Sequence, residues 1–315
     1  MPITSSLFAA SLPMIFYLLI IWKMDKYERE PFTNVLIHFL WGTFGATILA
    51  ISVSLIADFF SFYLRNNSHL IHTVIYAPII EEIVKGLFLF FSVRSKQFDN
   101  ITDGLVYGAA IGLGFGMMEN FIYFITYGTS LSSWIYIVII RSLFSAVMHC
   151  ISTATLGAFL GMAKFSKGTL ATVLQVIGLL LAMLFHFMWN ASVSFEETYY
   201  LGFLFMIVLI SCFIIVYKIS LYNEEKIIET ELREESKMGV LPETHAKILS
   251  SHLRFRKGWI DEKIRKLYSR YAVRLAFSKD QSKKVNDSKR KFYEIEIEKT
   301  REAIRSLLSN NFIES

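Results

Sequence analysis

Long apolar runs recur through the first two thirds of this chain, and they restrict its fold more than any other feature. A helix needs about 20 residues to cross a bilayer of about 30 Å. Because lipid offers the backbone no hydrogen-bond partner, such runs fold as membrane helices. The sequence therefore predicts an all-α, polytopic membrane helix bundle. We expect about seven spans, near residues 5–22, 34–62, 71–93, 103–127, 133–163, 168–192 and 199–219.

Lys and Arg between the spans predict the orientation of the bundle, because cytoplasmic loops are enriched in them. In the even-numbered loops between the spans, Arg65 is the only Lys or Arg residue. We expect a multi-pass protein of the plasma membrane with its N terminus outside and its C terminus in the cytoplasm. The first span has neither a preceding basic residue nor a small-residue cleavage site, so we expect a retained anchor. The odd-numbered loops contain Lys23, Lys26, Arg29, Arg94, Lys96, Lys164 and Lys167.

The basic excess of the chain lies in its C-terminal part. Residues 1–217 contain 10 Lys and Arg against 11 Asp and Glu, whereas residues 218–315 contain 22 against 16. A basic tail beside anionic lipid headgroups requires no nucleic-acid partner, and its mixed charges with helical periodicity indicate water-facing helices. We therefore divide the chain into a membrane domain, residues 1–222, and a helical cytoplasmic tail, residues 223–315.

Charged residues inside the apolar runs are the most unusual feature of the membrane domain. Glu81, Glu82 and Lys85 lie in the third predicted span, Glu119 in the fourth and Arg141 in the fifth. An unpaired charge at the bilayer centre costs roughly 2.5 to 3.5 kcal/mol. Together these charges would cost as much as the whole stability of an ordinary fold, roughly 5 to 15 kcal/mol. We expect them to be paired with one another and to have a function.

The spacing on the third span predicts one acid that is paired and one that faces a cavity. Lys85 lies one helical turn after both Glu81 and Glu82, so its ammonium group can reach either carboxylate. The two carboxylates themselves project about 100° apart. Pro78 cannot donate to the carbonyl of Val74, so we also expect a kink and a freed backbone polar group close to the acids.

Three further spans contribute polar side chains. Glycines at every fourth position between 104 and 116 predict a bare ridge for close helix packing, and the ridge leads to Glu119. The other candidates on the fifth and sixth spans are Arg141, His149, His186 and Asn190. Cys150 and Cys212 both lie within spans, and they indicate neither a disulfide framework nor a thiolate metal site.

The expected topology places four of these side chains at a similar depth. At about 1.5 Å per residue, Glu81 lies roughly 15 Å, Glu119 roughly 12 Å and His186 roughly 9 Å below the outer ends of their spans. His149 lies deeper, at roughly 24 Å on an overlong helix. We expect all four to meet in the outer half of the bilayer. Carboxylate and imidazole groups can activate water, and imidazole or amide N–H groups can stabilise an oxyanion, so the set predicts peptide-bond hydrolysis.

Four motifs follow one another on four of the predicted spans: EEIVK at 81–85, FGMMEN at 115–120, Arg141 with His149 and Gly157, and HFMWN at 186–190. In this order they resemble the PrsW family of intramembrane proteases. DKYEREP after the first span extends the resemblance, which covers most of residues 1–200. That family is similar to the type II CAAX prenyl endopeptidases, whose helices enclose a cavity where a glutamate and a histidine activate water. The resemblance implies cleavage of a membrane-anchored protein near the outer face, typified by an anti-sigma factor.

The resemblance also implies roles for the acidic residues. Glu81 resembles the water-activating base, and Glu82 resembles its supporting partner. Glu119 stands where the CAAX enzymes have a histidine, which leaves open whether it shares the proton or positions the water.

The remaining site residues follow from the same resemblance. His149 is implied as a second catalytic or oxyanion group, and His186 with Asn190 as the polarising pair. Lys85 and Arg141 are expected to support the acids. We expect a protease of the metal-independent, glutamic type, with no cofactor and no metal ion.

Three other readings of the chain stay open at this point. A metal-dependent protease would use Glu and His as zinc ligands, but the sequence lacks an H-E-x-x-H helix and its Glu-Glu pair projects in two directions. A secondary transporter would show paired repeats and interrupted helices, and we find no such repeat. A non-catalytic membrane scaffold would keep the helices without activity. The oligomeric state is left open.

Overall fold

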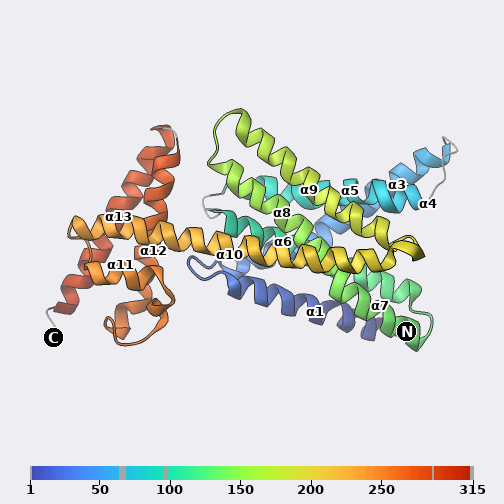
Figure 1. The fold of residues 1–315 in the computed structure, drawn as a ribbon, viewed down its shortest axis with the longest axis horizontal. Coiled ribbons are helices and arrows are strands. Elements are labelled where there is room, and N and C mark those ends of the chain that lie inside the picture. Colours follow the sequence, from blue (N-terminus) through green and yellow to red (C-terminus); the bar gives the residue numbers. More distant parts are fainter. Residues whose placement is uncertain (1, 64–68, 96–97, 99, 286, 313–315) are drawn as a thin grey trace. The chain divides into compact units, whose positions relative to one another are not determined.

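The protein is described here by a computed structural model that covers residues 2–63, 69–95, 98, 100–285 and 287–312. Within these residues helices are the only regular secondary structure, as the apolar runs predict (Figure 1). Arg65 and Lys96, which contribute to the predicted orientation, lie outside the described residues.

Six helical stretches among the described residues are long and apolar enough to cross a membrane, which confirms a polytopic helical architecture. The third predicted span, near 71–93, is also helical, but it is less apolar because it contains Glu81, Glu82 and Lys85. Its passage through the bilayer stays a prediction. The six stretches are Ile3–Met24, Phe32–Ala57, Ile101–Tyr127, Leu131–Lys164, Thr169–Val193 and Glu196–Lys237.

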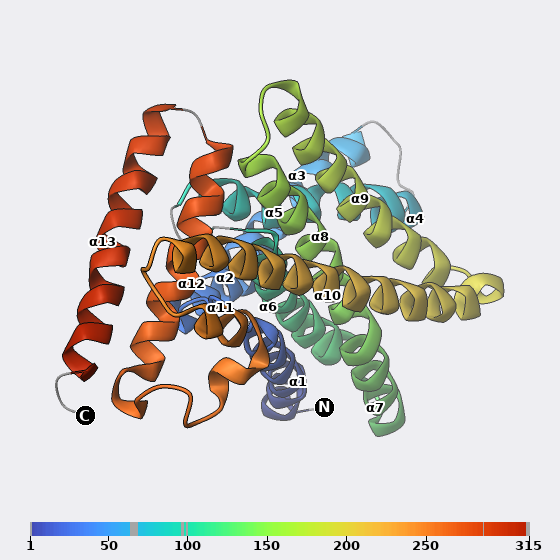
Figure 2. The same ribbon diagram turned by 60° about the vertical axis from the view of Figure 1, so that its left-hand side comes forward.

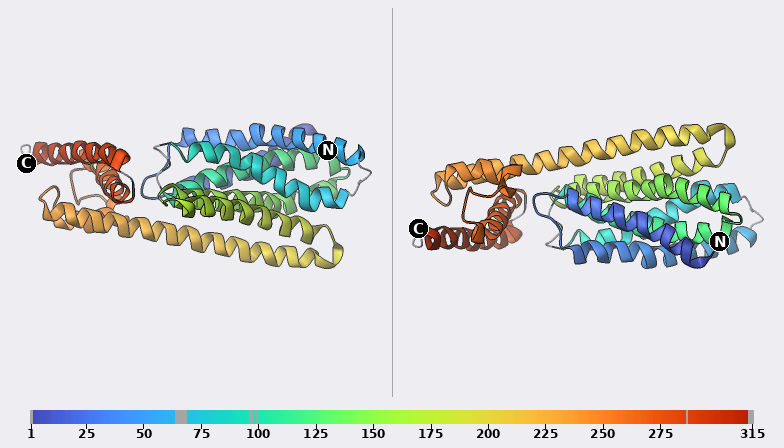
Figure 3. Two further views of the ribbon diagram at one scale, coloured as in Figure 1. Left: turned by 90° about the horizontal axis from the view of Figure 1, so that it is seen from above. Right: turned by 90° about the horizontal axis from the view of Figure 1, so that it is seen from below.

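The chain forms two compact units. The first consists of Met1–Asp25 and Glu30–Tyr217, and the second of Lys26–Arg29 and Lys218–Ser315. The helices of the first unit run alongside one another in both views of Figure 3. They are α1 (Ile3–Met24), α2 (Phe32–Leu40), α3 (Thr47–Tyr63), α4 (His69–Ile71), α5 (Ala77–Ser92), α6 (Ile101–Tyr127), α7 (Leu131–Ile140), α8 (Ala146–Lys164), α9 (Thr169–Val193) and the first part of α10 (Tyr199–Lys237).

Helix α6 packs against α8 along the predicted glycine ridge. A Cβ atom added at Gly104 would lie 2.1 Å from the carbonyl oxygen of Gly157, and one at Gly112 would lie 2.1 Å from that of His149. Cβ atoms do not approach backbone this closely, so only glycine fits at these positions. The ridge is confirmed, and it holds the His149 backbone directly against α6.

π-Helical turns interrupt the membrane helices near the polar residues. The turn His72–Tyr76 immediately precedes α5, in which Pro78 is one of the first two residues. Within this π-helical turn the Ala77 N–H bonds to the carbonyl of His72, which leaves the carbonyl of Thr73 free. The Thr73 carbonyl accepts a hydrogen bond of 2.9 Å from Asn190 Nδ2. The predicted disturbance at Pro78 therefore takes the form of a π-helical turn. Two further π-helical turns are Trp41–Ala46 and Arg141–Ser145.

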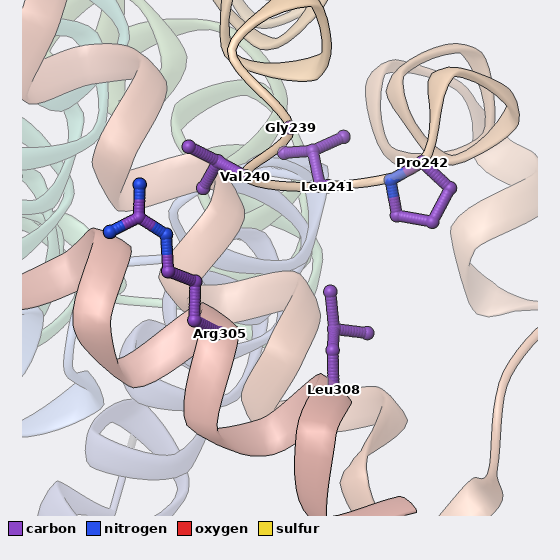
Figure 4. A pocket seen from close by; sticks show the side chains of 6 residues that line it. All are labelled: Gly239, Val240, Leu241, Pro242, Arg305 and Leu308. Atoms are coloured by element: carbon purple, nitrogen blue, oxygen red, sulfur yellow. The ribbon is translucent and has the colours of Figure 1, made fainter. Parts of the chain in front are cut away.

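The second unit is a small helical assembly with its own core. It contains the end of α10, then α11 (Glu243–Ser250), α12 (Glu262–Lys284) and α13 (Asp287–Phe312), with α12 and α13 side by side in Figure 2. Gly239, at φ 73°, lies between the end of α10 and the start of α11. A pocket of about 400 Å³ lies beside Gly239, and Figure 4 shows the residues that line it. The core includes Ile228, Leu232, Leu249, Tyr268, Leu275, Phe277 and Ile304.

A segment of the first loop belongs to this second unit. The Tyr27 hydroxyl donates to Glu225 Oε2 over 3.0 Å, and the Arg254 guanidinium lies 4.5 Å from the centre of the Tyr27 ring. Arg254 also donates to the carbonyl of Lys26. The predicted tail thus packs around residues from the start of the chain, while its boundary after residue 222 stays a prediction.

Candidate active site

Helix α5 holds two acids in different environments. Glu82 and Lys85 are fully buried, and Lys85 Nζ donates to Glu82 Oε1 over 2.5 Å. Glu81 is 15% exposed, and its Oε2 has no hydrogen-bond partner among the described residues. The α5 spacing therefore produces the predicted pairing of one acid with Lys85, while the other acid has no such partner; that Glu81 faces a cavity stays a prediction.

His149 on α8 connects Lys85 of α5 to Glu119 of α6. Its Nε2 lies 2.6 Å from Glu119 Oε2, and its Nδ1 lies 3.1 Å from Lys85 Nζ. Because an ammonium group can only donate, Nδ1 must accept from Lys85, and Nε2 then donates to Glu119. Both ring nitrogens of His149 are engaged in this arrangement.

His186 on α9 bridges the two acids of α5. Its Nδ1 lies 2.9 Å from Glu82 Oε1, and its Nε2 lies 3.8 Å from Glu81 Oε2. A carboxylate paired with an ammonium group accepts, so Nδ1 carries the proton and the Nε2 lone pair of a neutral ring faces Glu81. The His149 and His186 rings lie 4.7 Å apart between centres, at 88° to each other.

Arg141 fixes Glu119 from the other side. Its Nη2 forms an ion pair of 2.8 Å with Glu119 Oε2, and its Nε donates to Asn120 Oδ1 over 3.0 Å. The guanidinium also lies 3.6 Å from the centre of the Tyr123 ring. Asn120 and Tyr123 were not predicted as site residues, although Tyr123 follows Glu119 by one helical turn.

Asn190 lies apart from the charged cluster. It follows His186 by one turn on α9, and its amide nitrogen donates to the carbonyl of Thr73. Among the described contacts none joins the Asn190 side chain to the site acids or histidines. The structure thus brings together seven of the eight predicted residues: Glu81, Glu82, Lys85, Glu119, Arg141, His149 and His186.

Two hydroxyl groups that were not predicted as site groups also bond to Glu82. Ser152 Oγ donates to Glu82 Oε1 over 3.1 Å, and Thr153 Oγ1 donates to Glu82 Oε2 over 3.3 Å. They lie three and four residues after His149, on the same helix face. That spacing was the available signal.

The pairing explains how these charges are tolerated inside a helix bundle. Lys85 pairs with Glu82 and Arg141 with Glu119, while no Lys or Arg within the described chain forms an ion pair with Glu81. Hydrogen-bonded pairing offsets the desolvation of buried charges. Glu81 is therefore the one acid of the cluster without a cationic partner.

The comparison with protein families decides the identity of this bundle. A family model described as "PrsW family intramembrane metalloprotease" matches residues 30–217. The chain belongs to the PrsW family. The PrsW match contains every site residue described above, and it ends where the first compact unit ends, at Tyr217. The protein is thus a multi-pass membrane protein and an intramembrane protease, and the resemblance seen in its motifs is confirmed.

Curated relatives named Protease PrsW support this family membership. The one from Clostridioides difficile (strain 630) is 28% identical over 221 residues, which is 69% of this chain and 89% of that protein. The one from Bacillus subtilis (strain 168) is 27% identical over 175 residues, 55% of this chain and 76% of that protein. The one from Halalkalibacterium halodurans is 25% identical over 223 residues, 70% of this chain and 98% of that protein. No solved structure matches the chain.

The site residues fit a metal ion by type and spacing. Glu81, His149 and His186 each offer one ligand atom, and these atoms lie within 4.8 Å of one another. One carboxylate and two imidazoles form a donor set that zinc accepts. The divergence of the Glu81-Glu82 pair does not bear on this set, because the set takes one ligand from each of three helices. A metal on His149 would displace either Lys85 or Glu119 from its ring.

Proposed function

We propose that this protease hydrolyses a peptide bond of a membrane-anchored protein with water activated by Glu81. The observation that supports this role is the buried Glu81 Oε2, which has no hydrogen-bond partner in the described chain and faces His186 Nε2 at 3.8 Å. Glu82 and Glu119 are both paired with cations and are less suited to take a proton. Glu81 is therefore the acid best placed to act as a general base.

The proposed reaction needs no covalent intermediate. The water oxygen bonds to the scissile carbonyl carbon while Glu81 takes its proton. The proton then passes to the amide nitrogen as the carbon–nitrogen bond breaks. The N–H groups of His149 and His186 bond to Glu119 and Glu82 in the structure, so either ring would have to leave its carboxylate to stabilise the oxyanion of the intermediate. Asn190, one turn from His186, is a further candidate donor, because its amide has a second N–H besides the one that bonds to Thr73.

The paired residues have supporting roles in this proposal. Lys85 neutralises Glu82, and Glu82 holds the Nδ1 proton of His186. Arg141 holds Glu119, and Glu119 accepts from His149. Glu119 would then position His149 instead of activating water.

A metal-dependent mechanism is the second candidate, and the donor set of Glu81, His149 and His186 is the observation that favours it. A metal ion held there would act as a Lewis acid on water and on the substrate carbonyl. We favour the metal-independent form because both ring nitrogens of His149 already face Lys85 and Glu119.

Chelation distinguishes the two mechanisms. We expect 1,10-phenanthroline to leave proteolysis unchanged, with the weakly chelating 1,7-phenanthroline as the control. Inhibition by the first isomer alone, together with about one metal ion per purified chain, would overturn the metal-independent proposal.

The family resemblance and the loop charges support a particular substrate and topology. We propose a single-span substrate, typified by an anti-sigma factor, that is cut near the outer face of the plasma membrane. The N terminus would lie outside and the C terminus in the cytoplasm. A reporter fused after residue 315 should be active in the cytoplasm, and one inserted at 64–70 should be exposed outside; the reversed pattern would contradict this topology.

The first experiment compares the membrane-protein fragments of cells that express the wild type or Glu81→Gln at equal levels. N-terminal peptide mapping should reveal new termini close to one span of a single-span protein, in wild-type cells only. Glu196→Gln, an exposed change of the same type, serves as the control. Identical maps for wild type and Glu81→Gln would favour the non-catalytic scaffold over a Glu81-dependent protease.

A further inference from the structure

Two neighbouring hydroxyl groups on α8 are directed at the buried carboxylate of Glu82. Ser152 and Thr153 are both fully buried, and the distances to Glu82 are 3.1 Å from Ser152 Oγ to Oε1 and 3.3 Å from Thr153 Oγ1 to Oε2. Hydroxyls in membrane helices usually bond to the carbonyl one turn earlier on their own helix. Thr153 instead reaches a side chain on α5, and Ser152 reaches the same side chain in addition to a carbonyl of its own helix.

The two oxygens of Glu82 are held differently. Oε1 accepts from Lys85 at 2.5 Å, from His186 at 2.9 Å and from Ser152. Oε2 accepts from Thr153, which is its one donor among the described residues. The orientation of the carboxylate group about its terminal bond therefore depends on Thr153 at one oxygen and on three donors at the other.

Ser152 has an alternative acceptor, whereas Thr153 does not. Ser152 Oγ also lies 3.1 Å from the carbonyl oxygen of His149, and its single proton serves one acceptor at a time. Thr153 Oγ1 has Glu82 as its one acceptor among the described contacts. Thr153 is therefore the stronger of the two constraints.

The backbone of Thr153 is fixed by the glycine ridge. A Cβ atom added at Gly108 of α6 would lie 2.4 Å from the Thr153 carbonyl oxygen, so the two helices touch at this level. Since a threonine side chain has two main rotamers in a helix, a fixed backbone restricts the Thr153 hydroxyl to few directions, and the one observed points at Glu82.

We propose that Thr153, assisted by Ser152, is a positioning residue that acts through Glu82 on His186. With its carboxylate fixed, Glu82 keeps the proton on His186 Nδ1 and keeps Nε2 directed at Glu81. The effect on catalysis rests on the proposed function, whereas the effect on the His186 ring does not.

The first test is a direct measurement of the His186 ring in the full chain. Histidine labelled with ¹⁵N is incorporated, the protein is studied in detergent micelles, and the His186 signals are identified with His186→Gln. In the wild type we expect a protonated Nδ1 and an unprotonated Nε2. Thr153→Val, which has the same shape without the hydroxyl, should move both ¹⁵N shifts toward values averaged between the two tautomers.

Two control variants separate the hydroxyl from packing. Thr153→Ser keeps the hydroxyl and should keep the wild-type shifts. Thr155→Val makes the same chemical change on the same helix, where the lost hydroxyl bonds to the Ile151 carbonyl and, among the described contacts, to no site residue, and should also leave His186 unchanged. Wild-type His186 shifts in Thr153→Val would overturn the positioning proposal, whatever the proteolytic activity.

Kinetics with the cleaved protein found by peptide mapping provide the second test. Thr153→Val should lower kcat about ten-fold, the usual effect of losing one hydrogen bond to a charged group, with KM unchanged. Thr153→Ser should restore most of the rate. An equal loss in Thr153→Ser would overturn the positioning role and indicate packing. If the His186 shifts respond but the wild type cleaves nothing, the proposed function fails while the contact with Glu82 stands.

Discussion

His186 donates its Nδ1 proton to Glu82 Oε1 over 2.9 Å. This one hydrogen bond separates the roles of the two adjacent acids of α5, because it engages Glu82 and turns the other ring nitrogen toward Glu81, at 3.8 Å. A pair of neighbouring glutamates thereby becomes one structural acid and one open acid.

Replacing the open acid should remove activity and leave stability unchanged. In Glu81→Gln we expect proteolysis to fall at least about a hundred-fold, since a general base typically contributes that much or more. The thermal unfolding temperature in detergent should stay the same or rise, because Glu81 has no cationic partner in the described chain. A large fall in unfolding temperature would show instead that Glu81 is a structural acid.

Replacing the paired acid, Glu82, should lower the stability of the protein, in contrast to replacing Glu81. Glu82→Gln leaves the buried ammonium of Lys85 without its carboxylate, which typically costs about 3 to 5 kcal/mol. The double variant Glu82→Gln/Lys85→Met removes both charges and should recover much of that stability. Unfolding in increasing denaturant measures the cycle, and additive losses would contradict a direct pair.

The contact between α6 and α8 should be intolerant of one added methyl group. In Gly112→Ala the new Cβ meets the His149 carbonyl oxygen at 2.1 Å, so α8 must move and carry His149 away from Glu119. We expect lost activity and a destabilisation of about 1 to 3 kcal/mol, as for other overpacked contacts. Gly86→Ala is the control, because its Cβ would meet side chains and no backbone atom within 4 Å, namely the end of Leu156 at 2.8 Å and the Phe90 ring at 3.8 Å. Equal effects of the two changes would contradict the prediction.

The second compact unit should lose stability on mild acidification. Burial lowers the pKa of His245 from its ordinary value of 6.5, and the ring lies 3.0 Å from the Tyr268 hydroxyl and packs against Trp259. Because the folded pKa is below the unfolded pKa, the unfolded chain binds the proton more tightly and folding weakens as the pH falls below 6.5. Hydrogen exchange of peptides from 243–312 in urea, corrected for intrinsic rates, measures this loss. His245→Asn should flatten it, and an unchanged pH dependence would exclude His245 as its source.

The charged part of the site could be predicted from the sequence because charges in a membrane must find partners. The acids, Lys85, Arg141 and the histidines stand out against apolar runs, and their order on four spans matches the PrsW motifs. Their exact contacts could not be predicted. Asn190 shares a helix face with His186, yet its amide bonds to a carbonyl that only the π-helical turn at His72–Tyr76 makes free.

The contact of the Thr153 hydroxyl with Glu82 and the contacts within the second unit were harder to predict from the sequence. Thr155 bonds to its own helix while Thr153 reaches α5, and the four-residue spacing of Thr153 from His149 is the one sequence feature that distinguishes the two threonines. Tyr27 and Arg254 come together from distant parts of the chain, which periodicity does not reveal. Helix α10 continues to Lys237, well past the predicted span end near 219, because helix-favouring charged residues follow without a Gly or Pro.

The glycine ridge between α6 and α8 has a consequence for how membranes affect this enzyme. At Gly104, Gly108 and Gly112 the two backbones already touch, so no force from the bilayer can bring the helices closer. Lateral pressure or a change in bilayer thickness can act in one direction only, by parting them, and this would withdraw His149 from Glu119. Helices α6 and α8 are therefore already at their closest approach. A change of lipid composition can lower the activity of the site by separating them, but it cannot raise the activity by tightening this contact.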